Sequence, residues 1–291
     1  NASYRDEGFL RWCELHFSET KELVEKCSFL SVTSERLSRL ISEYTGIACE
    51  EKSRTTPNCL VFPRNINSSA TGKAQAMIWT SSDFAALTES KSEITEACAS
   101  FCREKKIPLF LFGKFSPELN SKFPNLRNFG MTNFLVHKQM LDEFNGKTIA
   151  VAPLETCSNK HTLDFIAGKS DLKMVEYGGH GIETIYSDSP PYRESDLLNM
   201  YVVGNNFQEW KTALEQAYEN PSLPIEKIAE IRDKRDATVI SMQNWLPLFI
   251  ESRRSIPISI LQIEAIIETK IKKPLIKRAW SKIPPLQSLI L

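Results

Sequence analysis

The residues best suited to chemistry lie in the segment KSDLKMVEYGG, which follows the apolar run KTIAVAP. Lys169, Lys173 and Glu176 recur at spacings of four and three, so a helix would place them on one face. Lys169 and Ser170 in its first turn would offer an ammonium group, a hydroxyl and backbone N–H groups to a diphosphate. Glu176, two turns deeper, would offer two carboxylate oxygens to the hydroxyls of a ribose.

The same spacing also fits a surface helix that binds nothing. An exposed ion pair between Lys173 and Glu176 would contribute only about 0.3 kcal/mol. The three glycines at 178, 179 and 181 close the helix instead of opening one, so they do not form a dinucleotide-binding fingerprint. His180 among them suits a turn or a helix C-cap. Spacing alone leaves both interpretations open.

The elements that must position these residues alternate regularly from Ala74 onward. Six short apolar runs predict strands: AMIW, IPLFLF, NLRNF, KTIAVAP, IETIYS and MYVVG. Helices are predicted between and after them, over residues 88–105, Asn133 to Phe144, KSDLKMVEY and NFQEWKTALEQAY. This alternation predicts an α/β fold with a doubly wound, Rossmann-like parallel sheet. Ligands bind such sheets where strands end and helices begin.

Helices are predicted on both sides of this region. Residues 1–54 read as helical segments around one strand, SFLSVTS, with Ser34 placed to cap the helix ERLSRLISEY. Pro57 and Pro63 bracket NCLVF, which predicts a short strand or an extended linker. Beyond residue 220 we expect separate helices, divided by prolines at 221, 224, 247 and 257.

The last segment is a basic amphipathic tail. It combines Ile and Leu with six Lys or Arg residues after Thr269. Such a helix either packs with a solvated basic face or docks on a membrane surface or a partner. Both interpretations remain open from the sequence.

Composition narrows the function further. Lys plus Arg and Asp plus Glu both count 36, so bulk charge does not favour nucleic-acid binding. The seven cysteines are odd in number and form no Cys-x-x-Cys pair, which argues against a disulfide framework and a zinc site and favours a cytoplasmic location. The start lacks a Met and the features of a signal peptide, so we expect a fragment.

A resemblance covers about residues 28 to 220. The run from KTIAVAP to SDSPPY, followed by YVVGNNFQEWKTAL, resembles the C-terminal donor-binding domain of GT-B glycosyltransferases of group 1, the family 4-like type. Those enzymes show an APL…N…KS…K…EY…G pattern, then Ser and Pro-Tyr, then an N…EW…AL helix. Upstream, SVTSERL and MIWTSSDFAAL resemble two further segments of the same family.

The resemblance implies a donor site for a nucleotide-diphosphate sugar. Glu176 matches the acidic residue that binds the donor ribose, and Lys169 and Ser170 match positions that line its phosphates. The other matched positions are Asn159, Lys173, Tyr192, Trp79 and Ser81. The implied reaction is a retaining sugar transfer to a glycan or glycolipid acceptor, as in polysaccharide biosynthesis, with no metal or other cofactor.

Two positions depart from the family pattern. Gly168 stands where the family has the first acidic residue of a Glu-x7-Glu pair, and Glu183 stands where it usually has proline. These departures leave open an alternative: a degenerate, non-catalytic module that serves in assembly or nucleotide binding.

The expected organisation is that of half an enzyme. A GT-B enzyme has two Rossmann-like domains, and only the last strand of the first is recognisable. We therefore expect a remnant or linker over 1–54, a nucleotide-sugar-binding domain over 55–220, crossing helices over 221–255 and the tail over 256–291. The missing N-terminal GT-B domain would belong to a longer chain or a partner subunit.

Overall fold

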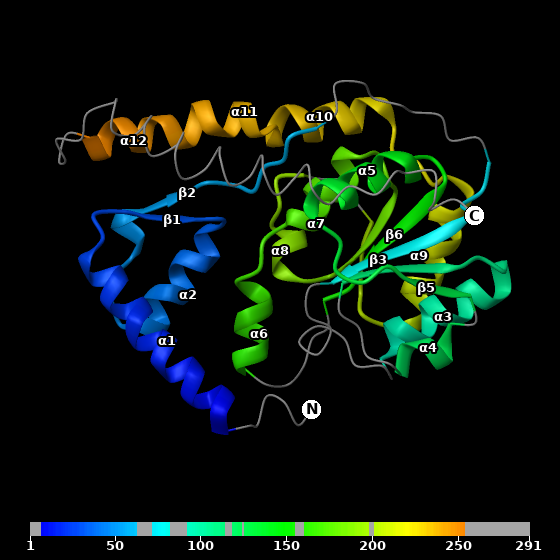
Figure 1. Ribbon diagram of the computed structural model, residues 1–291, viewed down its shortest axis with the longest axis horizontal. Helices are drawn as coiled ribbons and strands as arrows, with labels where there is room; N and C mark the ends of the chain where they lie inside the picture. Colours follow the sequence, from blue (N-terminus) through cyan, green and yellow to red (C-terminus); the bar gives the residue numbers. More distant parts are fainter. Residues whose placement is uncertain are drawn as a thin grey trace, which may run out of the picture. The chain divides into compact units, whose positions relative to one another are not determined.

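The computed structural model describes residues 7–62, 72–81, 92–113, 118–123, 125–154, 160–197 and 201–253 (Figure 1). The chain divides into two compact units, residues 1–240 and 241–291. The four-part division predicted from the sequence stays a prediction.

The first unit contains a six-stranded parallel sheet in the order β5-β4-β3-β6-β7-β8. Its strands are β3 (Ala76–Ser81), β4 (Leu109–Gly113), β5 (Leu126–Asn128), β6 (Thr148–Ala152), β7 (Thr184–Ser187) and β8 (Tyr201–Val203). The chain builds outward from β3 in one direction and then returns to add β6 on its other side. This confirms the predicted doubly wound fold, with the topological switch point between β3 and β6.

Helices cover both faces of the sheet, because alternate strand residues point to opposite sides. Met77 and Trp79 pack with α3 (Glu93–Lys105), α4 (Glu118–Lys122) and α9 (Phe207–Glu219). Ile78 packs on the other face with α5 (Phe134–Phe144), α6 (Lys160–Ala167), α7 (Leu172–Gly179) and α10 (Ile225–Arg235). Each fully buried Leu or Ile contributes about 1.5–3 kcal/mol, so these two layers stabilise the unit.

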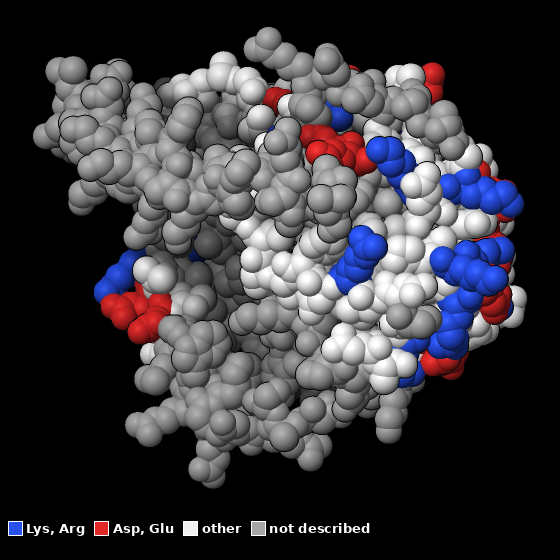
Figure 2. All heavy atoms as spheres, turned by 45° about the vertical axis from the view of Figure 1, so that its right-hand side comes forward, with Lys and Arg blue, Asp and Glu red and all other residues white. Residues whose placement is uncertain are grey.

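The solvent side of α3 and α9 is held by ion pairs between neighbouring elements. Lys105 pairs with Glu215, and Lys211 pairs with Glu104, at 2.5 and 2.6 Å. On the face that Figure 2 shows, basic and acidic side chains lie next to one another. Exposed pairs of this kind contribute about 0.2–1 kcal/mol each.

A smaller βαβ unit precedes the sheet. It follows α1 (Glu7–Lys26) and contains β1 (Leu30–Val32), α2 (Glu35–Thr45), the 3-10 turn Glu50–Lys52 and β2 (Ser53–Thr55). The predicted cap is confirmed, since the Ser34 side chain accepts a hydrogen bond from the Leu37 backbone N–H. β2, which the sequence did not predict, pairs in parallel with β1. Within the predicted extended run, Leu60 makes an isolated bridge to Asp236.

Two predicted helices begin later than expected, and helices also occur where none was predicted. The helix predicted from residue 88 begins at Glu93, after its N-cap Ser92. α7 begins at Leu172, so the prediction that Lys169 and Ser170 lie in its first turn is wrong. A helix that the sequence did not predict, α6, ends at Ala167, and residues 168–171 connect the two helices. A short helix, α8 (Pro190–Arg193), also follows β7.

The segment after α9 is helical, as predicted. α10 and α11 (Ala237–Ile240) complete the first unit, with Pro224 as the N-cap of α10. In the second unit, a π-helical turn (Ser241–Trp245) runs directly into α12 (Leu246–Arg253). Pro247 was expected to separate helices, which is wrong: it is the second residue of α12, and the π-helical turn Ser241–Trp245 continues directly into that helix. Pro257 and the basic tail lie outside the described residues.

No helix among the described residues is both long enough and apolar enough to cross a bilayer.

Candidate functional site

The candidate site lies where the parallel strands end and the helices of one face begin. β3 and β6 are neighbours in the sheet although they are far apart in sequence. The connection after β3 leads to β4 on one side, and the connection after β6 leads to β7 on the other side. Strands that diverge in this way open a crevice at their carboxyl ends. The loops that follow β3 and β6, residues 82–91 and 155–159, lie outside the described residues.

Glu176 is the central carboxylate of the site. It lies in α7 and is only 9% exposed. Its Oε2 accepts a hydrogen bond from Lys173 Nζ at 2.6 Å, and its Oε1 lies 3.0 Å from Nε2 of His137 in α5. The interpretation as an ordinary surface pair does not fit this geometry, because the carboxylate is buried and two helices contribute its partners.

Electrostatics keep Glu176 ionised. Burial alone would raise its pKa, but the ammonium group of Lys173 and the hydrogen bond to His137 outweigh burial and hold the pKa at about 2. An ionised carboxylate accepts about four hydrogen bonds, and His137 and Lys173 use two of these positions. The remaining capacity suits ligand hydroxyls.

Helix α7 is tied to the end of β3 next to this carboxylate. The Tyr177 hydroxyl donates to Thr80 Oγ1 at 2.7 Å, and Lys173 Nζ lies 5.3 Å from the centre of the Tyr177 ring. Ser81, the last residue of β3, is buried, and its Oγ has no hydrogen-bond partner among the described residues. The site therefore contains an unused hydroxyl at the carboxyl end of the central strand.

Gly113 closes the neighbouring strand, β4. Its φ of +119° is rare for residues with a side chain, and a Cβ here would lie 1.7 Å from the Ser81 carbonyl oxygen. Only glycine allows β4 to turn away from β3 at this point. Its N–H donates to the Gly130 carbonyl at 2.7 Å, which fixes the exit of β5 as well.

The loop that carries Lys169 and Ser170 is held by its next residue, Asp171. Ser195 donates to Asp171 Oδ2 at 2.6 Å. Arg235, at the end of α10, binds both carboxylate oxygens, with its nitrogens at 2.7 and 3.4 Å. Because Arg235 is only 3% exposed, this buried pair fixes the loop at the start of α7.

Lys169 and Ser170 line a polar cavity of about 400 Å³. The first turn of α2 forms another wall, where Ser34, Arg36 and Arg39 also line the cavity. Arg36 Nε donates to Glu194 Oε2 at 3.0 Å. Four cationic side chains line this cavity, and so do four carboxylates, those of Glu35, Asp171, Glu194 and Asp196. Because Arg36 is paired with Glu194 and Arg235 with Asp171, an anionic group such as phosphate would bind here through Lys169, Arg39 and backbone N–H groups.

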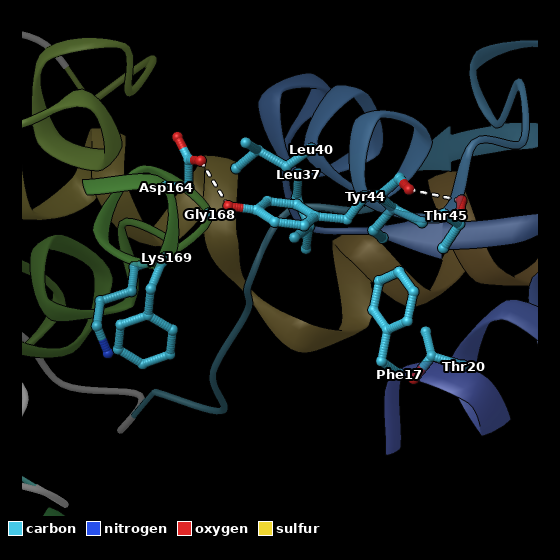
Figure 3. Close-up of a pocket in the computed structure, with 11 residues that line it drawn as sticks. Phe17, Thr20, Leu37, Leu40, Tyr44, Thr45, Asp164, Gly168 and Lys169 are labelled. Atoms are coloured by element: carbon cyan, nitrogen blue, oxygen red, sulfur yellow. Dashed lines mark hydrogen bonds between the residues drawn. The ribbon is translucent and has the colours of Figure 1, made fainter. Parts of the chain in front are cut away.

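A second cavity, of about 490 Å³, adjoins the first at Lys169 and is apolar (Figure 3). Leu37, Leu40 and Tyr44 of α2 form one wall of it. The Tyr44 hydroxyl donates to Asp164 Oδ2 at 2.6 Å and links α2 to α6. Two cavities of opposite character thus share one lysine.

The structure brings together part of the predicted site. Lys173 and Glu176 pair directly, and Lys169 and Ser170 line the polar cavity, whose lining includes neither Lys173 nor Glu176. Trp79 is packed in the core with α3 and α9. Tyr192 is buried against Tyr186, with their ring centres 5.0 Å apart. Both side chains present little surface to a ligand. Asn159 lies outside the described residues.

The sequence did not predict several polar residues of the site. They are His137, Arg36, Arg39, Asp171 and Arg235. The two arginines come shortly after the Ser34 cap and are three residues apart, a spacing that places both on one helix face. His137 and Arg235 carry no such signal, because their partners lie 39 and 64 residues away.

The described residues contain no group of three or more His, Cys, Asp or Glu side chains arranged to hold a metal ion. The prediction that no cofactor is required remains a prediction.

The parallel sheet and its strand order are those of a Rossmann-like GT-B domain, and the chain is similar in fold to solved structures of glycosyltransferases. HepE of Anabaena, in complex with UDP and glucose, matches with a TM-score of 0.59 at 12% identity over 82% of this chain and 68% of its own. A TarM variant of S. aureus, in complex with fondaparinux, α-GlcNAc-glycerol and UDP, matches with a TM-score of 0.54 at 16% identity over 79% of this chain. The chain spans only 45% of TarM.

A third similar structure is a glycosyltransferase involved in avilamycin A biosynthesis, with a TM-score of 0.50 at 13% identity over 77% of this chain and 62% of its own. No protein-family description and no curated protein matches the sequence. At these identities the comparisons establish the fold and leave the activity to be argued from the site.

Proposed function

We propose that this chain binds the donor of a glycosyltransferase, a nucleotide-diphosphate sugar, at the carboxyl edge of its sheet. The observation that carries the proposal is the buried, ionised Glu176, held by Lys173 and His137 on the helix that follows the Lys169–Ser170 loop. Its free acceptor positions suit the two hydroxyls of a ribose. The complexes of TarM and HepE contain UDP, which supports this class of ligand.

In the proposal, the diphosphate lies in the polar cavity. Lys169 and Ser170 supply an ammonium group and a hydroxyl, and Arg39 and the first turn of α2 supply positive charge from the opposite wall. These groups stabilise the negative charge that grows on the leaving diphosphate as the sugar bond breaks. No metal ion is required in this scheme, because fixed cations and backbone N–H groups supply the charge.

Retention of configuration and a glycan or glycolipid acceptor belong to the proposal as well. Both follow the resemblance of the sequence, and the fondaparinux and α-GlcNAc-glycerol in the TarM complex are consistent with carbohydrate acceptors for that protein. We also propose that a further GT-B domain, in a longer chain or a partner, contributes to the acceptor site. Contact of the basic tail with a membrane surface remains a proposal.

The test is calorimetric titration of the chain with UDP, GDP and CMP and their sugar conjugates at fixed salt. We expect one nucleoside diphosphate to bind selectively. Lys169→Ala and Glu176→Gln are each expected to weaken it about ten- to a hundredfold, because each removes charge-assisted hydrogen bonds of about 1.5–3 kcal/mol.

The matched control is Lys211→Ala, which removes the same charge from α9, where Lys211 pairs with Glu104. It is expected to bind as the unchanged chain does. If no nucleotide binds, or if all three variants lose affinity equally, the donor site is refuted and the non-catalytic assembly module becomes the better interpretation.

A further inference from the structure

His137 contacts the central carboxylate from a different part of the fold. It lies in the first turn of α5, whose N-cap Asn133 accepts from the Val136 N–H. The ring is 8% exposed, and Phe112 of β4 packs against it at 5.2 Å with an angle of 64°. Nε2 lies 3.0 Å from Glu176 Oε1, so the ring is fixed on one side and points its nitrogen at the carboxylate.

The hydrogen bond determines which ring nitrogen of His137 faces the carboxylate. Because Glu176 is ionised, Nε2 carries the hydrogen and donates. Nδ1 is buried without a hydrogen-bond partner among the described residues.

The two partners of Glu176 differ in how they constrain its carboxylate. Lys173 lies three residues earlier on the same helix, so it moves with Glu176 and cannot fix the carboxylate relative to the sheet. His137 belongs to α5 and is packed on β4, so it alone of these two joins the carboxylate to another element. Ordering a free glutamate side chain costs conformational entropy, and His137 orders the carboxylate before a ligand arrives.

We propose that His137 is a positioning residue, which orients the Glu176 carboxylate so that its free acceptor positions discriminate ribose from 2′-deoxyribose. This inference rests on the proposed function, since it needs Glu176 to contact the ribose. His137 itself touches no ligand in this scheme and acts through Glu176.

The experiment compares the affinities of UDP and 2′-deoxy-UDP, or of the GDP pair if GDP is the nucleotide that binds. The unchanged chain is expected to prefer the ribonucleotide about tenfold. His137→Phe keeps the aromatic packing and loses the donor, so its preference falls to about twofold or less. His137→Gln keeps a donor group near the position of Nε2 and retains most of the preference. His137→Leu serves if the phenylalanine variant does not fold.

The control is His180→Phe, which removes another buried histidine–carboxylate pair, that of His180 Nδ1 with Asp142 at 2.6 Å. It is expected to keep the tenfold preference, and thermal unfolding shows that each variant is folded.

The outcomes separate the inference from the function beneath it. An unchanged chain that binds neither nucleotide refutes the proposed function. An unchanged chain that binds both equally refutes the contact of Glu176 with the ribose, and with it the inference. A normal preference in the unchanged chain that persists in His137→Phe overturns only the inference. Equal loss in His137→Phe and His180→Phe also overturns it, because general destabilisation would then explain the result.

Discussion

Replacing Arg235 by methionine tests whether the buried pair with Asp171 holds the loop before α7. Arg235 is almost completely buried and binds both oxygens of Asp171, while Ser195 provides the only other side-chain hydrogen bond to that carboxylate among the described residues. Methionine preserves much of the volume of the arginine stem but leaves Asp171 charged and nearly buried.

The expected cost is worked from that orphaned charge. Removing one partner of a buried ion pair reduces the free energy of unfolding by about 3–5 kcal/mol. Adding Asp171→Asn neutralises the stranded carboxylate and keeps a hydrogen-bond acceptor for Ser195, so the double variant is expected to be about 1–3 kcal/mol more stable than Arg235→Met alone. Asp171→Asn alone is expected to cost less than Arg235→Met, because Arg235 still has Asp196 as a counter-charge.

The assay is urea unfolding at pH 7, followed by far-ultraviolet circular dichroism for all four proteins. The four free energies form a double-mutant cycle, in which the coupling of the two residues is measured directly. If the double variant loses the sum of the two single losses, within about 0.5 kcal/mol, the residues are not coupled and the argument is refuted.

Three further predictions follow from single residues. Gly113→Ala is expected to lose about 3 kcal/mol or more, because its Cβ meets the Ser81 carbonyl; the control Gly72→Ala, with φ +103° and open space around it, is expected to lose only the smaller cost of backbone strain in the same urea assay. Burial raises the pKa of Glu183 from its ordinary 4.5 to about 7. Between these pH values the folded state binds a proton that the unfolded state has released, so the free energy of unfolding falls by about 3 kcal/mol as the pH rises from 4.5 to 7. Glu183→Gln is expected to flatten that slope, and an unchanged slope would contradict the role of burial. Lys173→Met is expected to raise the pKa of Glu176 from about 2, because it removes the strongest attractive partner; carboxyl-carbon NMR titration measures this, and a pKa that stays at about 2 would show that Lys173 does not hold the charge.

The sheet was predictable because its strands are short, continuous apolar runs separated by amphipathic helices. The order of the strands could not be predicted, since doubly wound sheets with different strand orders share the same alternation. The helix α6 was not predicted, because its sequence, KHTLDFIA, looks like the polar loop that surrounds it. The start of α7 was predicted three residues too early. Arg235 and Ser195 bind Asp171 just before the helix, and these residues are too distant in sequence for a local pattern to reveal the contact.

The site was only half predictable, for a related reason. Lys173 and Glu176 share a helix, so their spacing predicted their contact. His137 and Arg235 reach their partners through the fold, and a sequence contains no local sign of such pairs. The burial of Trp79 was within reach, because it shares its strand face with Met77, which packs under α3 and α9.

The position of β3 at the middle of the sheet has a consequence for how the protein emerges from the ribosome. β3, β4 and β5 are neighbours and are made in that order, so this half can assemble with α3 before β6 has been synthesised. Leu60, however, bonds to the backbone of Arg235 and Ala237, which are made about 175 residues later. Leu60 therefore has no access to these backbone partners until about 175 further residues have been made.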